Sequence, residues 1–404
     1  MAVKGNLIVG QSGGCTAVIN SSLVGVVQTA LKSPAVGEVY GMLHGVEGLF
    51  RSEVVDLRAE PDGVWEEIKK TPSAALGSNR YKLSDDDIDR ALQILRSLDV
   101  RYFIYIGGND SADTAHRIAL AAQAANYELY AVAVPKTIDN DLPYTDHSPG
   151  YGSIARFIST VTQEIGLDTE AMRRVDPVKI LEVMGRDAGW VAASSILGKV
   201  RETDAPHLIY VPERPLVREK FLEDVENCYR KYGYVLVVVA ETVRDENGNH
   251  IARVDPVFSQ DAFGHKYISG TAAYLADLVS RDLGLRARYD KPGTIQRMSM
   301  AMASQVDLEE AYMVGRYAVE EVTKGTTNRM VTIERISNDP YMSKPGLVEL
   351  EKIANQQKLL PEEYISPEGN FVTKAFVEYA MPLIGGSAVS FPRLQGKRIA
   401  LKTI

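Results

Sequence analysis

The chain has 404 residues, of which 45% are hydrophobic and 24% are charged, and its formal net charge is −8. These values are typical of a globular protein of two or three domains, and with no basic tract they disfavour nucleic acid as a partner. Two cysteines, Cys15 and Cys228, exclude a disulfide framework or a cysteine-based metal knuckle. The sequence has no leader-like start and no run of about 18 apolar residues, so we expect a cytoplasmic protein with no membrane partner.

The first predicted strand, Asn6–Val9, leads into a glycine turn, Gln11–Cys15, and a predicted helix, Thr16–Lys32. This is the layout of a phosphate-binding turn, because glycines admit a ligand to the backbone and a helix amino terminus presents free N–H groups. The spacing matches neither the dinucleotide nor the Walker fingerprint, which argues against a nicotinamide-dependent oxidoreductase. Cys15 is interpreted as a small packing residue.

Val39–Met42 is the next predicted strand, and a helix is predicted to start at Ser84. The acids Asp85–Asp87 suit the positive end of that helix, and an apolar stripe follows them. We interpret the three acids as part of a helix start rather than as a metal site.

A second copy of the phosphate-binding layout begins with the predicted strand Tyr102–Ile106. Gly107–Ser111 follows it, and a helix is predicted over Ala112–Ala124. A glycine pair alone is weak support, because many strand-to-helix turns contain one for steric reasons.

The predicted strand Leu129–Val134 is followed by Pro135–Asp141, which contains two aspartates and a lysine. Paired carboxylates can accept a proton or hold a metal, and Lys136 can neutralise phosphate. Ligands of open α/β sheets bind at this carboxyl edge of the strands. Taken alone, the segment is equally consistent with a polar turn.

The strand Val178–Val183 precedes Met184-Gly185-Arg186, and His207–Val211 and Tyr234–Ala240 are further predicted strands. Alternation of strands and helices predicts βαβ units with a parallel sheet. Arg186 can fork onto a phosphate or carboxylate, or it can be a surface residue at a helix start. Beyond about residue 340 the sequence carries few chemical signals.

Together these segments resemble the phosphofructokinase family. The matching segments occur in the family's order between residue 7 and about residue 300, and they are Gln11–Cys15, Gly77–Arg80, Gly107–Ser111, Pro135–Asp141, Met184–Arg186, Glu241 and Ile295–Arg297. The resemblance implies an α/β fold of two Rossmann-like three-layer domains, whose parallel-rich sheets face across an active-site cleft. It implies a phosphoryl-donor domain of residues 1–150 plus about 294–345, and a sugar-phosphate domain of residues 151–293 plus about 346–404.

The resemblance also implies residue roles. Asp139 is expected to take the proton from the 1-hydroxyl of fructose 6-phosphate, beside Thr137 and Ile138. Further substrate-binding positions are Met184, Gly185, Arg186, Glu241, Arg288 and Arg297, the last two for the 6-phosphate. The phosphoryl-donor positions are Gly13, Arg80 and Gly108. Asn109 and Asp141 are the expected Mg²⁺ ligands, and Asn109 offers a neutral oxygen where the family usually has an aspartate.

Two positions distinguish the phosphoryl donors. Asp110 and Lys136 stand where ATP-dependent members have glycine, as in members that use diphosphate. Asp110 would repel and block a nucleotide's α-phosphate, and Lys136 would supply charge to diphosphate and its leaving phosphate. Both residues are therefore assigned to catalysis. The expected reaction is reversible phosphate transfer from diphosphate to fructose 6-phosphate, giving fructose 1,6-bisphosphate. The alternatives are an ATP-dependent enzyme and a non-catalytic regulatory paralogue.

The resemblance further predicts a homodimer or homotetramer, because related enzymes complete the sugar site with a basic residue from the next subunit. Pro177 falls near the family arginine that plays this part. Arg173, Arg174 and Lys179 are candidates to replace it. Thr294 stands where ATP-dependent bacterial members have a sugar-phosphate histidine.

Overall fold

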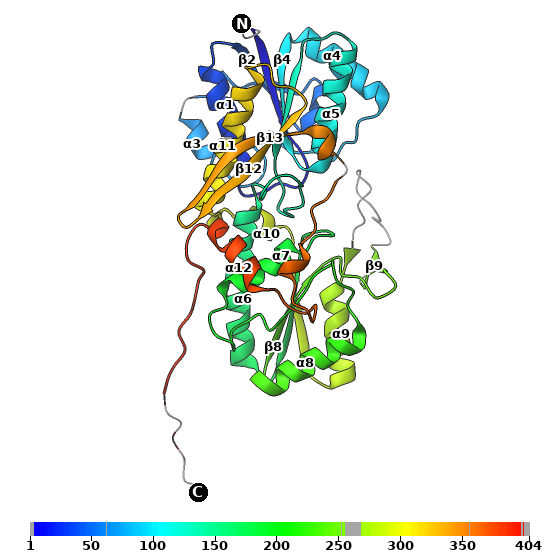
Figure 1. The fold of residues 1–404 in the computed structure, drawn as a ribbon, viewed down its shortest axis with the longest axis vertical. Coiled ribbons are helices and arrows are strands. Elements are labelled where there is room, and N and C mark those ends of the chain that lie inside the picture. The colour runs from blue at the N-terminus through cyan, green and yellow to red at the C-terminus, as the bar shows by residue number, and fades with distance from the viewer. Residues whose placement is uncertain are drawn as a thin grey trace.

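The computed structural model describes residues 4–61, 63–251, 253–254, 268–354, 356–396 and 399. Residues 1–3, and residues 255–267 of the predicted sugar-phosphate domain, lie outside this part. The described part is built around two main sheets, with the larger in the upper half of Figure 1 and the smaller in the lower half. No helix among the described residues is long and apolar enough to cross a membrane.

The larger sheet has seven strands in the order β13-β12-β5-β4-β1-β2-β3. Their bounds are β1 Gly5–Gln11, β2 Val36–Met42, β3 Val54–Asp56, β4 Val100–Gly107, β5 Tyr130–Pro135, β12 Arg329–Asn338 and β13 Tyr341–Glu349. The five central strands pair in parallel, and the edge strands β3 and β13 pair antiparallel to their neighbours. Such parallel strands are buried on both faces, which explains why β1, β4 and β5 are recognisable as apolar runs, whereas β12 was not predicted.

Helices cover both faces of this sheet. Their bounds are α1 Ile19–Lys32, α2 Gly45–Phe50, α3 Val64–Ile68, α4 Asp85–Ser97, α5 Asn109–Ala124 and α11 Gln305–Val322. Side chains alternate along a strand, so Leu7 packs with the cluster that contains α1 and α11, whereas Ile8 packs with the cluster of α4 and α5. Helix α4 begins with the predicted cap, because Ser84 and Asp87 form a capping box.

Helices α1 and α11 approach so closely that glycine is required at their contact. A Cβ on Gly25 would lie 2.3 Å from the Tyr312 carbonyl oxygen, and one on Gly315 would lie 2.1 Å from that of Ser22. Ser21 Oγ also donates to the Leu308 carbonyl at 2.7 Å. A helix that follows the second sheet in the sequence is thereby fixed against the first.

The smaller sheet has four parallel strands in the order β11-β6-β8-β7. Their bounds are β6 Val178–Val183, β7 Leu208–Tyr210, β8 Val235–Ala240 and β11 Ala287–Asp290. The helices of this half are α6 Tyr151–Met172, α7 Trp190–Ala193, α8 Arg218–Tyr232, α9 Thr271–Leu283, α10 Ile295–Met298 and α12 Lys374–Ala380. The short strands β9 Arg253–Val254 and β10 Ile268–Ser269 form a separate antiparallel pair. Parallel sheets with helices on their faces confirm the predicted α/β class.

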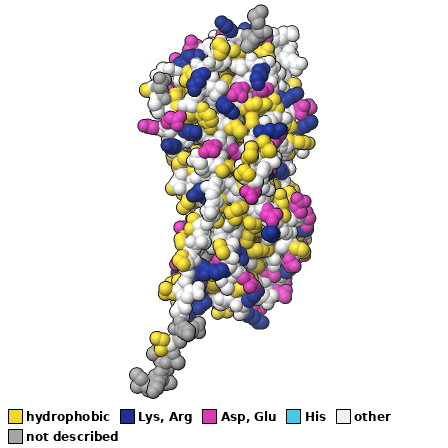
Figure 2. Space-filling view, turned by 60° about the vertical axis from the view of Figure 1, so that its left-hand side comes forward, with side chains coloured by type: hydrophobic (Ala, Val, Ile, Leu, Met, Phe, Trp, Pro, Cys, Tyr) yellow, Lys and Arg dark blue, Asp and Glu magenta, His cyan; other side chains and the backbone are white. Residues whose placement is uncertain are grey.

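The strand order is relevant to the predicted domains but does not fix their limits. The domain limits therefore stay a prediction. Strands β12 and β13 join the first sheet although they follow the second sheet in the sequence. The chain then returns to the lower half, where α12 lies beside α6 and α7 (Figure 1), and Phe376 and Leu383 pack into the core of that half. On the face seen in Figure 2, basic and acidic side chains are interspersed over both halves.

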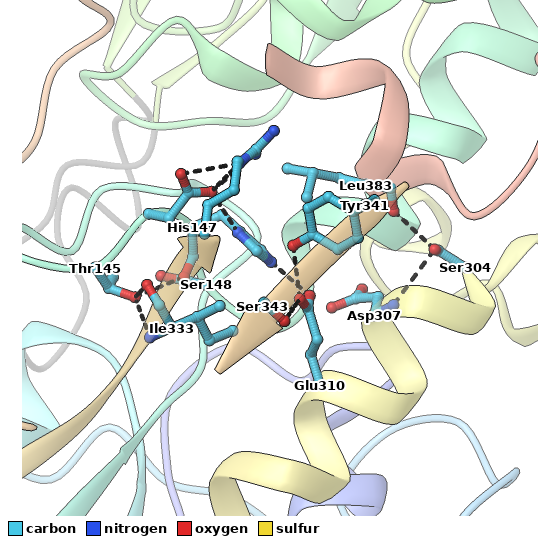
Figure 3. A network of polar contacts seen from close by, with 12 residues as sticks. Thr145, His147, Ser148, Ser304, Asp307, Glu310, Ile333, Tyr341, Ser343 and Leu383 are labelled. Atoms are coloured by element: carbon cyan, nitrogen blue, oxygen red, sulfur yellow. Dashed lines mark hydrogen bonds and ion pairs between the residues drawn. The ribbon is translucent and has the colours of Figure 1, made fainter. Parts of the chain in front are cut away.

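A buried charge network joins the crossover after β5 to α11 and β13. His147 is 1% exposed and lies between Asp146 Oδ1, 2.8 Å from its Nδ1, and Glu310 Oε2, 2.5 Å from its Nε2. In Figure 3, Glu310 reaches from α11 toward His147 and also accepts hydrogen bonds from Tyr341 and Ser343 of β13. Burial opposes the charge on His147, but the two carboxylates outweigh it and raise the pKa of the imidazole to about 9.

Candidate active site

Three polar segments meet at the carboxyl edge of the seven-stranded sheet, because β1, β4 and β5 are parallel neighbours that end together. Gln11 pairs with Ile106, and Gly107 pairs with Pro135. The Ser12 N–H donates to the Ile106 carbonyl at 2.9 Å, and the Lys136 N–H donates to the Gly107 carbonyl at 2.9 Å. The sequence predicted each segment separately, and the sheet register brings them together.

Lys136 closes the first glycine turn from the side. Its ammonium donates to the Gly14 carbonyl at 2.8 Å, and a Cβ on Gly13 would lie only 3.1 Å from its Nζ. The side chain is 3% exposed, and burial lowers the pKa of Lys136 to about 8, although Asp139 partly opposes this shift. A lysine held in this way places a positive charge beside the backbone of a phosphate-binding turn.

Asn109 and Asp110 lie in the first turn of α5, not in a loop before it. The helix begins at Asn109, three residues before the predicted start, and Gly108 is its N-cap residue. Gly107 must be glycine here, because a Cβ would lie 2.0 Å from Ser111 Oγ. The N–H groups of a first helical turn face an approaching anion, while the carboxylate of Asp110 adds negative charge at the same place.

Arg80 follows a residue that lines the same turn. Asn79 is buried, its carbonyl accepts from the Gly13 N–H at 2.9 Å, and its side chain contacts Ser12. The structure therefore places Arg80 next to the predicted donor position Gly13.

The aspartate loop, residues 136–142, carries the two carboxylates. Asp139 is buried, and its N–H donates to Thr137 Oγ1 at 3.1 Å. Asp139 Oδ2 lies 3.5 Å from Nε of Arg186, which comes from the end of β6 in the other sheet. The proposed base is therefore beside a cation that comes from the other sheet. Ile138 belongs to the core of the lower half.

Asp141 and Asn109 are the expected magnesium ligands, and each offers an oxygen that could bind the ion together with substrate phosphate. Burial, reinforced by the nearby Asp139, raises the pKa of Asp141. Asn109 Oδ1 is buried, and among the described residues it has no hydrogen-bond partner. Mg²⁺ is commonly held by one or two protein oxygens together with substrate phosphates. No group of three or more His, Cys, Asp or Glu residues is arranged for a metal within the described part of the chain.

The sugar-side residues gather at the carboxyl edge of the smaller sheet. The Met184 N–H donates to Gln296 Oε1 at 3.1 Å, and the Glu241 N–H donates to the Val183 carbonyl at 3.0 Å. Burial raises the pKa of Glu241 to about 7; Lys291 opposes this shift and Asp139 adds to it. Gly185 has a φ of 143°, so this turn requires glycine.

Arg297 lies between the residues around the glycine turn and the sugar-side residues of the smaller sheet. A Cβ on Gly14 would lie 3.1 Å from Arg297 Nη1, and Arg297 lowers the pKa of Lys136 as a nearby like charge. Its Nε is buried and has no hydrogen-bond partner among the described residues. The guanidinium therefore faces both the glycine turn and Lys136 and can bind an anion there.

Arg288 is not brought to this edge within one chain. It pairs with Lys179 near the start of β6, and its Nε lies 3.0 Å from Asp176 Oδ2. Met184 is five residues further along, so the separation is roughly 16 Å at 3.3 Å per residue.

At this opposite end of the strands, a hollow of about 430 Å³ is lined by Arg173, Arg174 and Arg286 among others. Lys179, the third candidate to replace the family arginine near Pro177, is paired with Asp290 at 2.9 Å.

Sequence reasoning missed three residues that contact the site. Lys291 pairs with the buried Glu182 at 2.6 Å and influences Glu241. Lys358 and Tyr379 hold the aspartate loop from the end of the chain. The sequence offered a signal for Lys291, because this lysine lies just before the matching segment Ile295–Arg297. The contacts of Lys358 and Tyr379 with the aspartate loop span more than 200 residues and leave no local pattern in the sequence.

The profile of the phosphofructokinase family matches residues 6–322. This chain belongs to the phosphofructokinase family. It is 39% identical over 388 residues to the pyrophosphate–fructose 6-phosphate 1-phosphotransferase of Halomonas elongata, covering 94% of this chain and 92% of the relative. It is 32% identical to a sulfofructose kinase of Alkalicoccus urumqiensis, covering 95% and 96%.

A solved structure also has a fold similar to that of this chain. The pyrophosphate-dependent phosphofructokinase of Marinobacter aquaeolei has a TM-score of 0.86 and 40% sequence identity, covering 97% of this chain and 94% of the other. The likeness extends over both sheets and over the segment beyond the family match, and it confirms the phosphofructokinase fold.

Proposed function

We propose that this chain transfers a phosphoryl group from diphosphate to the 1-hydroxyl of fructose 6-phosphate, giving fructose 1,6-bisphosphate and orthophosphate. The observation that carries the donor assignment is the position of Lys136, whose Nζ lies 2.8 Å from the Gly14 carbonyl in the glycine turn. The relatives from Halomonas and Marinobacter, whose names specify this donor, support the assignment.

The proposed step uses four side chains directly, and two more would hold Mg²⁺. Asp139 accepts the proton of the 1-hydroxyl, the sugar oxygen bonds to the nearer phosphorus, and the bridging P–O bond of diphosphate breaks. Lys136 stabilises the departing orthophosphate, whereas Arg186 and Arg297 bind the sugar phosphate. Asn109 and Asp141 would hold Mg²⁺, which neutralises charge on the diphosphate oxygens. No nucleotide is consumed, so the reaction should also run from fructose 1,6-bisphosphate and orthophosphate.

The deciding experiment is an assay of the purified protein with magnesium and fructose 6-phosphate, using diphosphate or ATP as donor. We expect turnover with diphosphate in both directions and little or none with ATP. The 6-sulfonate analogue of the sugar is a necessary second acceptor, because a relative is named a sulfofructose kinase. ATP turnover without diphosphate turnover would overturn the donor assignment, and no turnover with either donor would favour the regulatory paralogue.

Variants of the two donor-side residues sharpen this test. Asp110→Gly removes the repulsion of an α-phosphate, so ATP should bind without being used efficiently, because Lys136 still occupies the same region. Asp110→Gly combined with Lys136→Gly should lose most diphosphate activity. Asp113→Gly is a matched control, since it removes a carboxylate and adds a glycine further along α5. It should leave the donor preference unchanged.

A further inference from the structure

The segment after β13 returns to the aspartate loop, although it lies beyond the family match at residues 6–322. The Lys358 N–H donates to the Asp141 carbonyl at 2.7 Å, and its ammonium donates to the Thr145 and Asp146 carbonyls at 3.1 and 2.9 Å. The Trp190 indole donates in turn to the Lys358 carbonyl at 3.0 Å. This segment is therefore attached to the backbone of the loop and of the crossover that follows it.

Asn140 is the residue of the loop that this segment reaches through a side chain. It lies between Asp139 and Asp141, is fully buried, and has a φ of 55°. Left-handed backbone is unfavourable for most residues, but asparagine tolerates it when its amide is engaged locally. Both amide atoms are engaged: Oδ1 accepts from the Ser148 N–H at 3.1 Å, and Nδ2 donates to the Tyr379 hydroxyl at 3.0 Å.

The Tyr379 hydroxyl is suited to hold this position. It accepts from Asn140 and donates to the Asp146 carbonyl at 2.8 Å, so both sides of the hydroxyl are used. Burial, with Asp146 nearby, raises the pKa of Tyr379 well above its usual value, which keeps the donated proton in place. The ring packs against Trp190 and Tyr364, with centroids 5.4 and 5.6 Å away, and Arg335 donates to the Tyr379 carbonyl at 2.8 Å.

We propose that Tyr379 is a positioning residue for phosphoryl transfer, which fixes Asn140 and through it the peptides that carry Asp139 and Asp141. The proposal rests on the function proposed above for Asp139. Proton transfer and metal binding depend on sub-ångström placement of these carboxylates, so a loosened loop should slow the chemical step. Tyr379 makes no described contact with the predicted donor- or sugar-binding residues, so substrate affinity should change little.

The first test compares Tyr379→Phe with Tyr364→Phe. Both substitutions remove one phenolic oxygen from the same aromatic cluster, but within the described part of the chain Tyr364 makes no hydrogen bond to the loop. Tyr379→Phe loses two buried hydrogen bonds, of which the one from Asn140 holds the loop. Loss of that bond should lower kcat roughly 3- to 10-fold, with KM for both substrates within about twofold of wild type. Tyr364→Phe should stay within about twofold in kcat. Equal effects of the two variants, or a change confined to KM, would overturn the proposal.

The second test is a double-mutant cycle with Asn140→Gly, which keeps the left-handed backbone accessible and removes the amide. If Tyr379 acts through Asn140, adding Tyr379→Phe to Asn140→Gly should lower kcat by less than about twofold. Additive losses would contradict the proposal. If Asn140→Gly does not fold, hydrogen exchange of the backbone amides of residues 138–142 replaces the cycle. We expect faster exchange in Tyr379→Phe than in Tyr364→Phe, and equal exchange in the two variants would contradict the proposal.

A failure of the proposed function can be distinguished from a failure of the proposal for Tyr379. A wild type that uses ATP and not diphosphate overturns the donor assignment, yet the Tyr379 comparison can then be made with ATP. If the wild type turns over neither donor, the amide-exchange comparison still decides whether Tyr379 holds the loop.

Discussion

The carboxyl edges of the two sheets are provided with positive charge in different ways. At the edge of the seven-stranded sheet, Lys136 comes from the same chain and donates to the glycine turn. At the four-stranded sheet, Arg186 is near Asp139, but Arg286 and Arg288 are paired with Asp176 at the opposite end of the strands. Lys136 therefore reaches the predicted donor side within one chain, whereas Arg288, one of the arginines expected on the sugar side, lies away from it.

This difference has a physical reason. A parallel sheet gathers at one edge whatever follows its strands, and the glycine turn, α5 and the aspartate loop all follow strands of the larger sheet. Arg288 lies inside β11, opposite Lys179, so the sheet register holds it away from the edge. Within one chain Arg288 therefore does not reach the predicted sugar side, and the homo-oligomer stays a prediction.

The largest effect should come from Asp139, where the two edges meet. Asp139→Asn keeps the size of the side chain but removes proton acceptance, so kcat should fall about 10²–10⁴-fold, with a much smaller change in KM for the sugar. Steady-state kinetics in both directions measures this. A variant that retains more than about a tenth of wild-type kcat would rule out Asp139 as the base.

The arginines at the meeting point should affect the sugar and not the donor. Arg186→Ala or Arg297→Ala removes a charge-assisted contact worth about 1.5–3 kcal/mol, so KM for fructose 6-phosphate should rise tenfold or more. Arg244→Ala is a suitable control, because it removes a partly exposed arginine after β8 that pairs with Asp187, the residue next to Arg186. If only KM for the donor rises, the assignment of these two arginines to the sugar is wrong.

Arg288 tests whether the sugar side is completed by a second subunit. Arg288→Ala should raise KM for fructose 6-phosphate about five- to tenfold. Mixed oligomers of Asp139→Asn and Arg288→Ala chains should then regain activity, because one site combines an intact Asp139 with an intact Arg288 from its neighbour. No recovery on mixing, or a fully active monomer in sedimentation, would show that the sugar side is complete within one chain.

A further effect is expected on stability, at the buried charge network of His147, Asp146 and Glu310. The pKa of His147 is raised from about 6.5 to about 9, so its contribution should be present in full below pH 6.5 and be lost as the pH rises through 9. The loss should be on the order of 3 kcal/mol. Urea unfolding of wild type and His147→Gln at pH 6 and pH 9.5 measures it.

The comparison with His147→Gln is needed because other buried groups titrate in the opposite sense. Burial lowers the pKa of Lys136 and Lys358 to about 8, so these lysines cost stability at neutral pH and cost less as the pH rises. Both are present in wild type and variant, so the difference between the two proteins isolates the histidine. A difference that does not shrink with rising pH would contradict a charged His147.

The features predicted from sequence are those that depend on local pattern. Strands β1, β4, β5, β6 and β8 were apolar runs because parallel strands are buried on both faces. The cap at Ser84 was visible in four consecutive residues. The start of α5 was placed too late, because glycine and asparagine favour turns, yet Asn109 and Asp110 are helical here.

The features that escaped prediction depend on contacts between distant parts of the chain. Nothing local to Tyr379 indicates that it binds Asn140, and nothing local to Arg288 indicates that its strand register holds it at the far end. The family resemblance supplied the identity of the site residues, but not which of them one chain can assemble. The assigned roles stay predictions until the variants above are measured.

The pairing of β12 with β5 has a consequence for how the protein is made. β5 ends at Pro135, and its partner β12 begins only at Arg329, after every strand of the smaller sheet has left the ribosome. At about 5–20 residues per second, the edge of β5 waits roughly 10–40 s for its neighbour. The smaller sheet can fold first, while the nascent larger sheet still has an unpaired apolar edge at β5. Truncated chains that stop before β12 should therefore aggregate during synthesis.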